Sequence, residues 1–415
     1  DADGSTAYAT LKLALLGGAR KAIAYRLADG NEAASSLTLQ DTATTPANVL
    51  KLTAKYPGKR GDAFKATVQA NAADAGRQEL KLYEGTRLLR TFAFAGGDLQ
   101  AAADAVNGDA GNRWIVASVL AAGTGTLAAV TGATFAGGDS GLAGIANADY
   151  TDALAAFETQ QFDAVALDGV TDAALQASVA AWIGRIREEG IGAIAVLGGS
   201  SADDLAGDAV AKATARSASF NHEGIVNVGT GAKLGDDSYS SAQLSAYVAG
   251  LIAGQPLSAS TTYAGAPFAD VTRRWTRAEQ EGAVRGGVFL LVHDGRMVKA
   301  LRGVNSLVSP GEGKSSAWKK IRTVRVMDSI NADLRRTAED SYIGKVNNTE
   351  EGRLALIGAC KQYLQTLAQA GVIEATGYDV AVDPDFTPEP DQVFLKWEAR
   401  LTDVVEQIFG TFVVR

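Results

Sequence analysis

The hydrophobic pattern of the second half of the chain constrains the fold more than any other feature. After Gly137-Gly138, short segments that are apolar throughout alternate with segments whose apolar residues follow a helical spacing. The apolar segments are Ala164–Leu167, Ile191–Leu197, Ile225–Val228 and Gly287–Val292. Strands of a parallel sheet are apolar along their whole length because helices cover both faces of the sheet. This part of the chain is therefore predicted to be a doubly wound α/β domain.

Helices are predicted between these strands and at the start of the chain. Those between the strands are expected at Tyr150–Gln160, Asp172–Glu189, Ala202–Arg216 and Ser240–Ala253. The leucines of Ala7–Lys21 also follow a helical spacing, and Ala22–Leu27 is predicted to be a short strand. The chain is thus expected to open as a helix followed by a strand.

From about Ser35 to Thr131 the pattern has a period of two residues instead. Apolar and polar residues alternate, and turn sequences such as Pro57-Gly58 and Gly96-Gly97 separate the alternating runs. The alternating pairs include Leu37 and Leu39, Leu50 and Leu52, Leu80 and Leu82, and Phe92 and Phe94. Short strands with one polar face predict a small β-sandwich or barrel.

The C-terminal part combines a basic segment with two helices and an apolar tail. Arg296–Lys345 holds 11 basic and 5 acidic residues, although the whole chain has a net charge of −8. Helices are predicted at Asp328–Tyr342 and from Thr349 to a stop at Gly371. The tail alternates at Val393, Leu395 and Trp397, and it ends with Ile408, Phe409, Phe412 and Val413. An apolar strand at a chain terminus needs a partner.

Composition excludes several classes of protein. A pI near 5.0 argues against a dedicated nucleic-acid-binding protein. No window reaches the roughly 18 consecutive apolar residues of a membrane span. Cys360 is the one cysteine, so the chain has no internal disulfide, and His222 and His293 lie too far apart in the sequence for a typical structural zinc site.

No motif for catalysis, cofactor binding or metal binding is convincing. Pro310–Ser315 has Val308 where a phosphate-binding loop needs its first glycine, and Gly137–Gly141 lacks the spacing of a dinucleotide turn. His222 and His293 are the available histidine bases, and no G-x-S-x-G motif occurs. Asp203-Asp204 and Asp236-Asp237 fit helix starts or solvated loops as well as a cation site. We therefore predict no catalytic, cofactor or metal residues.

The basic stretch Lys319, Lys320, Arg322 and Arg325 has two open interpretations. It is either a solvated face or a docking surface for an acidic partner, since the rest of the chain is strongly negative.

Several segments together resemble the contractile tail sheath family of bacteriophages and related contractile injection particles. Ala54–Asp62 resembles the turn that opens the family's inserted β-sandwich, with Asp62 where asparagine is more usual. Phe135–Gly141, Asn221–Val228 and Tyr247–Gly254 are similar to its α/β domain. The C-terminal likeness is the most specific, and it lies in Gly303–Leu307, Trp318–Asp328 with Ile330, Tyr342–Asn348 and Gly352-Arg353.

The resemblance implies a multidomain α/β protein. Residues 1–34 are expected to belong to the α/β domain, 35–132 to an inserted β-sandwich, and 133–305 to a doubly wound α/β domain that is subtilisin-like in topology only. Residues 306–415 are expected to form an α+β C-terminal domain that ends in an exchangeable strand. The resemblance also implies an N-terminal arm before the first helix, and the sequence, which begins at Asp1, is expected to lack that arm.

The resemblance further implies a structural function without an enzyme activity or a cofactor. Such subunits stack as hexameric rings around a tail tube and contract to drive the tube through a target envelope. The expected partners are other copies, the tube protein, and baseplate and tail terminator proteins, without direct nucleic-acid contact or membrane insertion. The expected location is the virion tail, assembled in the bacterial host cytoplasm.

The resemblance also assigns roles to residues. Terminal arms of the family add strands to neighbouring sheets, which makes Val393, Leu395, Trp397, Ile408, Phe409, Phe412 and Val413 candidates for an inter-subunit arm. The candidates for contact with the tube or a neighbour are Lys319, Lys320, Arg322, Arg325, Arg335 and Arg336.

Two alternatives stay open from the sequence. One is an α/β hydrolase-like enzyme with an accessory β-sandwich, which requires a pocket centred on His222 or His293. The other is a surface-binding module with an exposed aromatic patch, for which Tyr83, Phe92 and Phe94 are the candidates.

Overall fold

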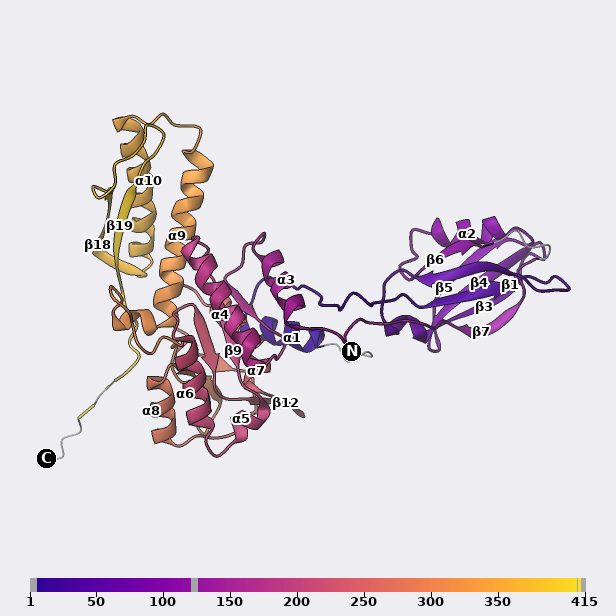
Figure 1. Cartoon of the computed structure of the whole chain (residues 1–415), viewed down its shortest axis with the longest axis horizontal. Helices are drawn as coiled ribbons and strands as arrows, with labels where there is room; N and C mark the ends of the chain where they lie inside the picture. The colour runs from indigo at the N-terminus through magenta and orange to yellow at the C-terminus, as the bar shows by residue number, and fades with distance from the viewer. Residues whose placement is uncertain (1–5, 121–125, 409, 412–415) are drawn as a thin grey trace. The chain divides into compact units, whose positions relative to one another are not determined.

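The computed structural model describes residues 6–120, 126–408 and 410–411. The chain forms two compact units (Figure 1). The first contains residues 1–6 and 25–153, and the second contains residues 7–24 and 154–415. None of the described helices combines the length and apolar character that a bilayer crossing requires.

The first unit is a β-sandwich of two antiparallel sheets, as the alternating pattern predicted. The strand orders are β1-β2-β6 and β5-β4-β3-β7. The strands are β1 (Ser36–Gln40), β2 (Asn48–Ala54), β3 (Phe64–Ala70), β4 (Arg77–Glu84), β5 (Arg87–Ala95), β6 (Ile115–Val119) and β7 (Val130–Thr134). The 3-10 helix η1 (Lys59–Ala63) precedes β3, and helix α2 (Leu99–Asn107) connects β5 to β6.

The core of the sandwich is formed by alternate residues of the strands. Leu80 on β4 pairs in register with Val68 on β3 and with Phe92 on β5. Phe92 and Phe94 are 2% and 3% exposed, respectively. These two phenylalanines are therefore core residues and are not available to an aromatic binding patch.

Asp62 ties together three segments of this unit. One carboxylate oxygen accepts hydrogen bonds from the Ser35 hydroxyl at 2.7 Å and from the Gly138 backbone N–H at 2.9 Å. A Cβ at Gly138 would stand 2.3 Å from Ser35 Oγ, so this approach requires glycine. Because one oxygen accepts both bonds, an asparagine could make the same contacts, and the departure from the family pattern at Asp62 leaves the turn intact.

The second unit is built on a parallel sheet with the strand order β15-β10-β9-β8. The strands are β8 (Ala164–Ala166), β9 (Ile194–Gly198), β10 (Ile225–Val228) and β15 (Val288–Phe289). The main helices of this part are α1 (Ala7–Gly17), α4 (Ala173–Glu188), α6 (Ala209–Phe220) and α7 (Ser241–Gly254). The predicted parallel sheet is present.

Helices cover both faces of this sheet, as predicted. Val226 and Val228 of β10 belong to a buried cluster with α7. The residue between them, Asn227, points the other way and donates hydrogen bonds to Ala213 O and Ser217 Oγ of α6. The four strands follow one another in sequence order, so the strand order lacks the reversal that is usual in a doubly wound sheet.

Helix α1 packs directly on the backbone of α7. A Cβ at Gly250 would stand 2.0 Å from the carbonyl oxygen of Ala14, and one at Gly17 would stand 2.2 Å from that of Tyr247. Glycine at both positions lets the two helix backbones approach each other closely. Helix α1 thereby covers one side of α7, most of whose residues are buried.

Smaller elements complete this unit. Two antiparallel sheets have the orders β12-β11-β14 and β13-β17-β16. Their strands are β11 (Ala232–Leu234), β12 (Asp237–Tyr239), β13 (Gly265–Ala266), β14 (Asp270–Val271), β16 (Leu291–His293) and β17 (Val298–Ala300). This unit also contains helices α5 (Ser201–Leu205) and α8 (Arg277–Arg285), whereas helix α3 (Asn147–Phe157) spans the point in the chain where the first unit ends and the second resumes.

Three predicted elements before residue 306 differ from the structure in whether they form, or in whether they form one element or two. Ala22–Leu27 forms no strand, because it pairs with no other strand among the described residues. The helix predicted at Ala202–Arg216 is two helices, α5 and α6, because the chain turns extended at Ala206 before α6 begins. The strand predicted at Gly287–Val292 divides at Leu290 into β15 and β16, which belong to different sheets.

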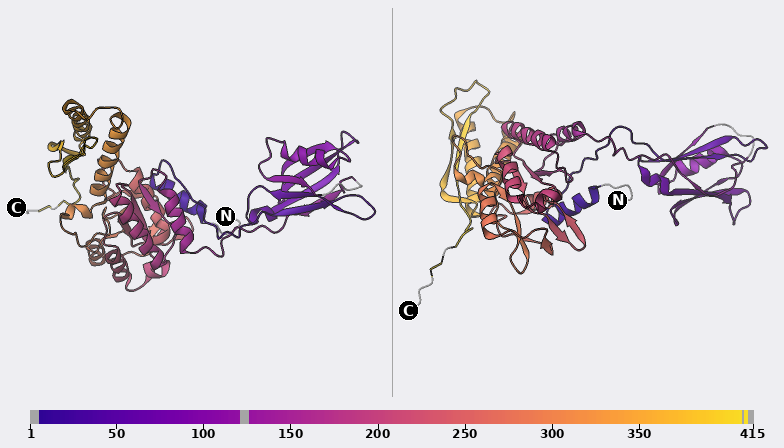
Figure 2. Two further views of the ribbon diagram at one scale, coloured as in Figure 1. Left: turned by 45° about the horizontal axis from the view of Figure 1, so that its top comes forward. Right: turned by 60° about the horizontal axis from the view of Figure 1, so that its bottom comes forward.

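Residues 316–401 form the C-terminal module (Figure 2). It contains the 3-10 helix η2 (Ser316–Lys319), helices α9 (Ile321–Ser341) and α10 (Glu350–Gln369), and strands β18 (Ile373–Val382) and β19 (Leu395–Leu401). The two helices pack with β18 around Ile330, Leu334, Cys360 and Leu364. Helix α10 begins directly after Thr349, the predicted first residue, which is its N-cap, but α9 begins at Ile321 and not at the predicted Asp328.

Candidate assembly site in the C-terminal module

The end of the chain folds back as an antiparallel hairpin. Leu395 and Trp397 lie in β19, where they pair with Val382 and Val380 of β18. The Trp397 indole also donates a hydrogen bond to Asn331 Oδ1 on α9 at 3.1 Å. This sheet has two strands, so among the described residues each strand keeps one edge without a ladder partner. Such an edge can accept a further strand.

The tail after β19 leaves the module as an extended and largely exposed segment. Val405 and Ile408 are 81% and 88% exposed. Val393 precedes β19 by two positions and is half-buried. Phe409, Phe412 and Val413 lie outside the described residues. Of the predicted arm residues that the structure describes, Leu395 and Trp397 lie in a strand paired within its own chain, Val393 precedes that strand, and Ile408 lies in the tail after it.

Two arginines of the predicted basic surface, Arg322 and Arg325, make their contacts inside the subunit. The guanidinium of Arg322 points inward and donates hydrogen bonds to the carbonyl oxygens of Leu257 and Thr402. Arg325 donates to Gln255 O at 2.8 Å. Burial lowers the pKa of both arginines. Because α9 begins earlier than predicted, both side chains lie in a packed helix, and the prediction that they form an external contact has to be corrected.

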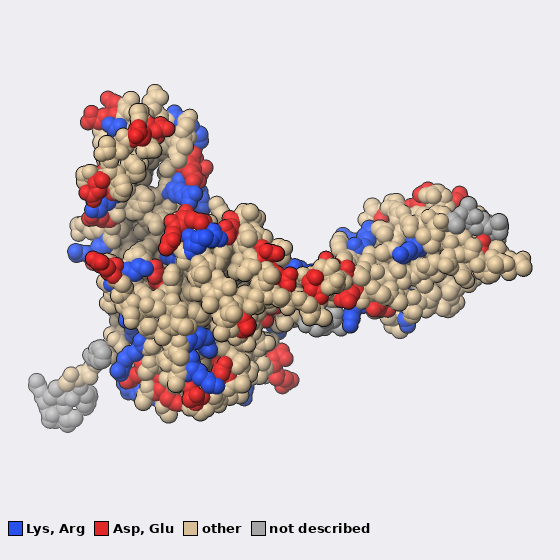
Figure 3. All heavy atoms as spheres, in the orientation of Figure 1, with Lys and Arg blue, Asp and Glu red and all other residues tan. Residues whose placement is uncertain are grey.

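The lysines of this stretch are also engaged within the chain. Lys319 donates a hydrogen bond to Val308 O at 2.7 Å. Lys320 forms ion pairs with Asp403 and Glu406 of the tail. Arg335 and Arg336 are exposed on α9, where they pair with Glu339 and Asp333. On the face shown in Figure 3, basic and acidic side chains lie side by side along this module.

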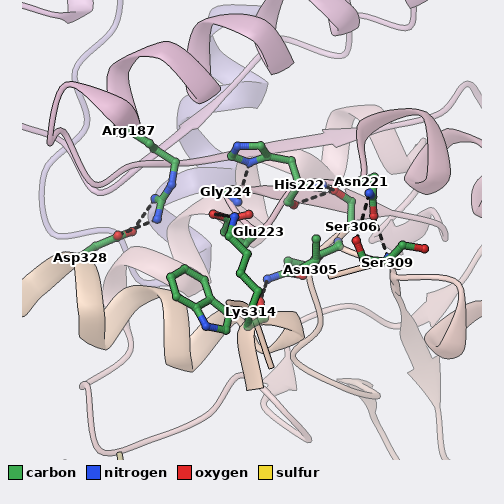
Figure 4. A network of polar contacts seen from close by, with 12 residues as sticks. Arg187, Asn221, His222, Glu223, Gly224, Asn305, Ser306, Ser309, Lys314 and Asp328 are labelled. Atoms are coloured by element: carbon green, nitrogen blue, oxygen red, sulfur yellow. Dashed lines mark hydrogen bonds and ion pairs between the residues drawn. The ribbon is translucent and has the colours of Figure 1, made fainter. Parts of the chain in front are cut away.

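A buried polar network joins the C-terminal module to the α/β domain (Figure 4). Arg187 of α4 holds the carboxylate of Asp328 on α9 with two hydrogen bonds of 2.7 Å. Burial raises the pKa of Asp328, although Arg187 opposes that shift. A Cβ at Gly192 would stand 2.5 Å from Asp328 Cβ. The sequence analysis missed this pair because its members lie 141 positions apart and carry no local motif.

His222 belongs to the same network and supports a turn. Its Nδ1 accepts a hydrogen bond from the Gly224 N–H at 2.9 Å, and burial lowers its pKa. The adjacent Glu223 forms an ion pair of 2.7 Å with Lys314. Lys314, from the rejected phosphate-loop candidate, thus serves as a partner inside the protein.

His293 also accepts a hydrogen bond within a turn, from the Gly295 N–H at 3.0 Å. The cavity beside it measures about 30 Å³, which is room for about one water molecule. In the parts of the chain that the structure describes, no group of three or more His, Cys, Asp or Glu residues is placed to hold a metal ion. These observations give no support to the hydrolase alternative.

The remaining candidates are parts of the fold. Asp203 pairs with Lys212 at 2.9 Å. Asp204 is buried, and it accepts hydrogen bonds from the backbone and the hydroxyl of Ser241 at 2.7 and 2.6 Å. Burial raises the pKa of Asp204 to about 6. Cys360 lies in the core of the C-terminal module, and burial raises its pKa.

Three family models match successive parts of the chain. The phage tail sheath β-sandwich domain matches residues 28–140, the phage tail sheath central domain matches 143–306, and the phage tail sheath C-terminal domain matches 313–415. Together they cover everything except residues 1–27, 141–142 and 307–312.

Relatives and solved structures agree with this match. The protein XkdK of the phage-like element PBSX of Bacillus subtilis is 29% identical over 396 residues, which cover 89% of this chain and 76% of that protein. The sheath tail protein of Desulfitobacterium hafniense is 28% identical with a TM-score of 0.75, over 96% of this chain and 84% of that one. The Listeria innocua sheath tail protein has the same fold, with a TM-score of 0.67 and 24% identity over 96% of this chain and 86% of that one. The chain therefore belongs to the phage tail sheath family and is a structural subunit of such a sheath.

Proposed function

We propose that this subunit polymerises with copies of itself as stacked hexameric rings around a tail tube, and that the polymer contracts to drive the tube through a target cell envelope. The observation that carries this proposal is the C-terminal hairpin, which combines open strand edges with an extended, exposed tail. A tail of this kind can reach a neighbouring subunit, and an open strand edge can accept the tail of a neighbouring subunit as a further strand.

The physical basis of the contact is strand addition. A strand that joins a neighbour's sheet gains main-chain hydrogen bonds, and its alternate side chains fill pockets. Ile408 and the apolar residues after it are the proposed anchors, and the free edges of β18 and β19 are the proposed acceptors. Such a contact tolerates reorientation of the subunits because it does not depend on a rigid surface between domains.

Contraction requires two arrangements of the same subunits. In this proposal the extended arrangement is held kinetically and the contracted one buries more or better surface, so no nucleotide is needed. The subunit acts by assembly and not by catalysis. We assign residues 1–34 and 133–305 to a subtilisin-like α/β domain, 35–132 to the inserted sandwich, and 306–415 to the C-terminal domain with its exchangeable strand.

The other partners follow from the same proposal. They are the tube protein, the baseplate and the tail terminator, in a virion tail that is assembled in the host cytoplasm. Within the predicted basic set, Arg335 and Arg336 are the exposed members, which favours them for a contact with the tube or a neighbour. A polar contact of this kind can be released during contraction, whereas a large apolar interface is not easily separated.

Electron microscopy of the purified protein tests the proposal. The full chain is compared with a version that ends at Glu406. We expect tubes or stacked rings from the full chain and their loss in the truncated one. A monodisperse monomer at high concentration from both versions would contradict the proposal.

A further inference from the structure

One side chain of the tail is buried although the residues around it are exposed. The side chain of Glu406 is 7% exposed, whereas Val405 and Ile408 on either side are 81% and 88% exposed. The carboxylate thus leaves an exposed segment and enters the body of the second unit. Burying a charge in this way is costly unless several donors receive it.

Four side chains from three segments receive this carboxylate. Thr262 donates a hydrogen bond to Oε1 at 2.7 Å, and Ser260 Oγ lies 3.0 Å from the same oxygen. Arg302 Nη2 lies 3.0 Å from Oε2, and Lys320 Nζ lies 3.5 Å from it. We call these four residues, Ser260, Thr262, Arg302 and Lys320, the carboxylate pocket.

The pocket is held in shape by contacts that do not involve Glu406. Thr262 Oγ1 accepts a hydrogen bond from the Gly303 N–H at 2.9 Å, and Ser260 Oγ accepts one from the Thr262 N–H at 3.1 Å. A Cβ at Gly303 would stand 2.5 Å from Thr261 Oγ1 and 3.2 Å from Ser260 Oγ. The two hydroxyls are therefore held in place by the packed loop around Gly303, and together with the two cations they surround one carboxylate.

The segment before Glu406 is fastened as well, but through different groups. Arg322 donates to the carbonyl oxygen of Thr402, and the Thr402 N–H donates to Val372 O at 3.2 Å. Asp403 pairs with Lys320, yet its side chain is 59% exposed. Ion pairs this exposed contribute little. Glu406 is thus the last firm attachment before the exposed Gln407 and Ile408.

We propose that Glu406 anchors the root of the C-terminal arm, so that the carboxylate pocket sets the point from which the arm can reach a neighbouring copy. This inference rests on the proposed role of the tail in assembly. Release of Glu406 frees the four residues after Thr402, which lengthens the reach of the arm by about 13 Å when extended. The length of the arm is thereby set by one buried carboxylate, and Lys320 and Arg302 act on assembly from inside the subunit.

Hydrogen–deuterium exchange on the unassembled fraction tests the anchor directly. In the variant Glu406→Gln, we expect the amides of Thr402 and Val404, which donate hydrogen bonds to Val372 O and Asp403 Oδ1, to exchange about ten-fold faster. The loss of hydrogen bonds to the buried carboxylate makes local opening of this segment more frequent. The variant Arg302→Gln removes one of the two cations of the pocket and is expected to act in the same direction. Strand β10 serves as an internal reference, because its exchange reports on the folding of the whole unit.

The matched control is Glu398→Gln, which removes a glutamate that is 71% exposed and lies 3.6 Å from Lys396 on the same strand. We expect it to leave the exchange of the Thr402 and Val404 amides unchanged. If these amides exchange as slowly in Glu406→Gln as in the wild type, the proposal that Glu406 anchors the arm is wrong. Equal acceleration in Glu398→Gln overturns it too, because the effect then reflects charge alone.

Electron microscopy of the same samples separates this inference from the proposed function. Faster exchange in Glu406→Gln without tubes from any sample supports the anchor and contradicts the sheath polymer. Tubes from the wild type with unchanged exchange in Glu406→Gln support the polymer and contradict the anchor. If both hold, tubes of Glu406→Gln are expected to be irregular, and tubes identical to wild type contradict the role of the pocket in setting the arm.

Discussion

Arg187 on α4 and Asp328 on α9 form a bidentate ion pair across the junction between the α/β domain and the C-terminal module, with both nitrogen–oxygen distances at 2.7 Å. The two side chains are 12% and 13% exposed. Arg187 also donates to Ala193 O at 2.9 Å, at the start of the segment that leads into β9. This pair fixes α9 against the sheet, which matters for a module that carries the proposed arm.

Loss of this pair is expected to destabilise the second unit. Asp328→Ala leaves the buried Arg187 charge without its partner, which costs about 3 kcal/mol in the free energy of unfolding. Chemical denaturation measures the change. The matched control is Glu339→Ala, which removes a partner of Arg335 in a pair that is more than half exposed on both sides. A loss no larger than in this control would show that the junction does not depend on the pair.

The close contact of α1 with α7 gives a second prediction. Gly250→Ala places a Cβ 2.0 Å from the carbonyl oxygen of Ala14, so α1 has to shift and stability falls by about 1–3 kcal/mol. Gly282→Ala on α8 is the control, because its Cβ would have no atom within 4 Å. Alanine is the better helix former, and this control is expected to gain about 0.5–1 kcal/mol. Thermal unfolding of both variants measures the two stability changes, which are expected to have opposite signs.

The buried carboxyl of Asp204 is expected to make the free energy of unfolding depend on pH. Burial raises its pKa to about 6 from the ordinary aspartate value of 3.8, so the folded state binds the proton more tightly than the unfolded state. The contribution of Asp204 to the free energy of unfolding is fully present below pH 3.8, where the carboxyl is protonated in both states. This contribution is lost as the pH rises through 6. Ionisation at neutral pH thus costs the folded state about 3 kcal/mol.

Asp204→Asn removes this titration while an amide can still contact Ser241. Relative to wild type, the variant is expected to become more stable as the pH rises from 4 to 7. Urea denaturation at several pH values measures the difference between the two proteins. A constant difference across this range would contradict the assignment to Asp204.

The exposed arginines of α9 provide a prediction about assembly. Arg335→Glu with Arg336→Glu is expected to leave the unfolding free energy of the monomer within about 1 kcal/mol, because exposed ion pairs contribute little. If these residues contact the tube or an acidic neighbour, charge reversal weakens polymerisation or contraction, which electron microscopy can score. Assembly and contraction at wild-type levels would show that the contact lies elsewhere.

Local patterns in the sequence were sufficient for the elements with strong periodicity. Strand β10 spans the predicted Ile225–Val228, and α4 begins after its predicted N-terminal residue Asp172, whose side chain accepts a hydrogen bond from the Leu175 N–H. Buried strands and capped helices depend on residues a few positions apart. Their signals are therefore present in the linear sequence.

Tertiary structure decided the roles of the charged residues. Arg322 and Arg325 look like a solvated or docking face in the sequence, but α9 packs them against carbonyl oxygens of residues 65–80 positions away. Leu395 and Trp397 pair with β18 of their own chain, and Glu406 enters a pocket assembled from three separate segments. Periodicity and composition therefore determined the sandwich and the helix-flanked parallel sheet. The packing of distant segments decided which charges are buried and where the tail leaves the subunit, because burial and partner choice are properties of the folded chain.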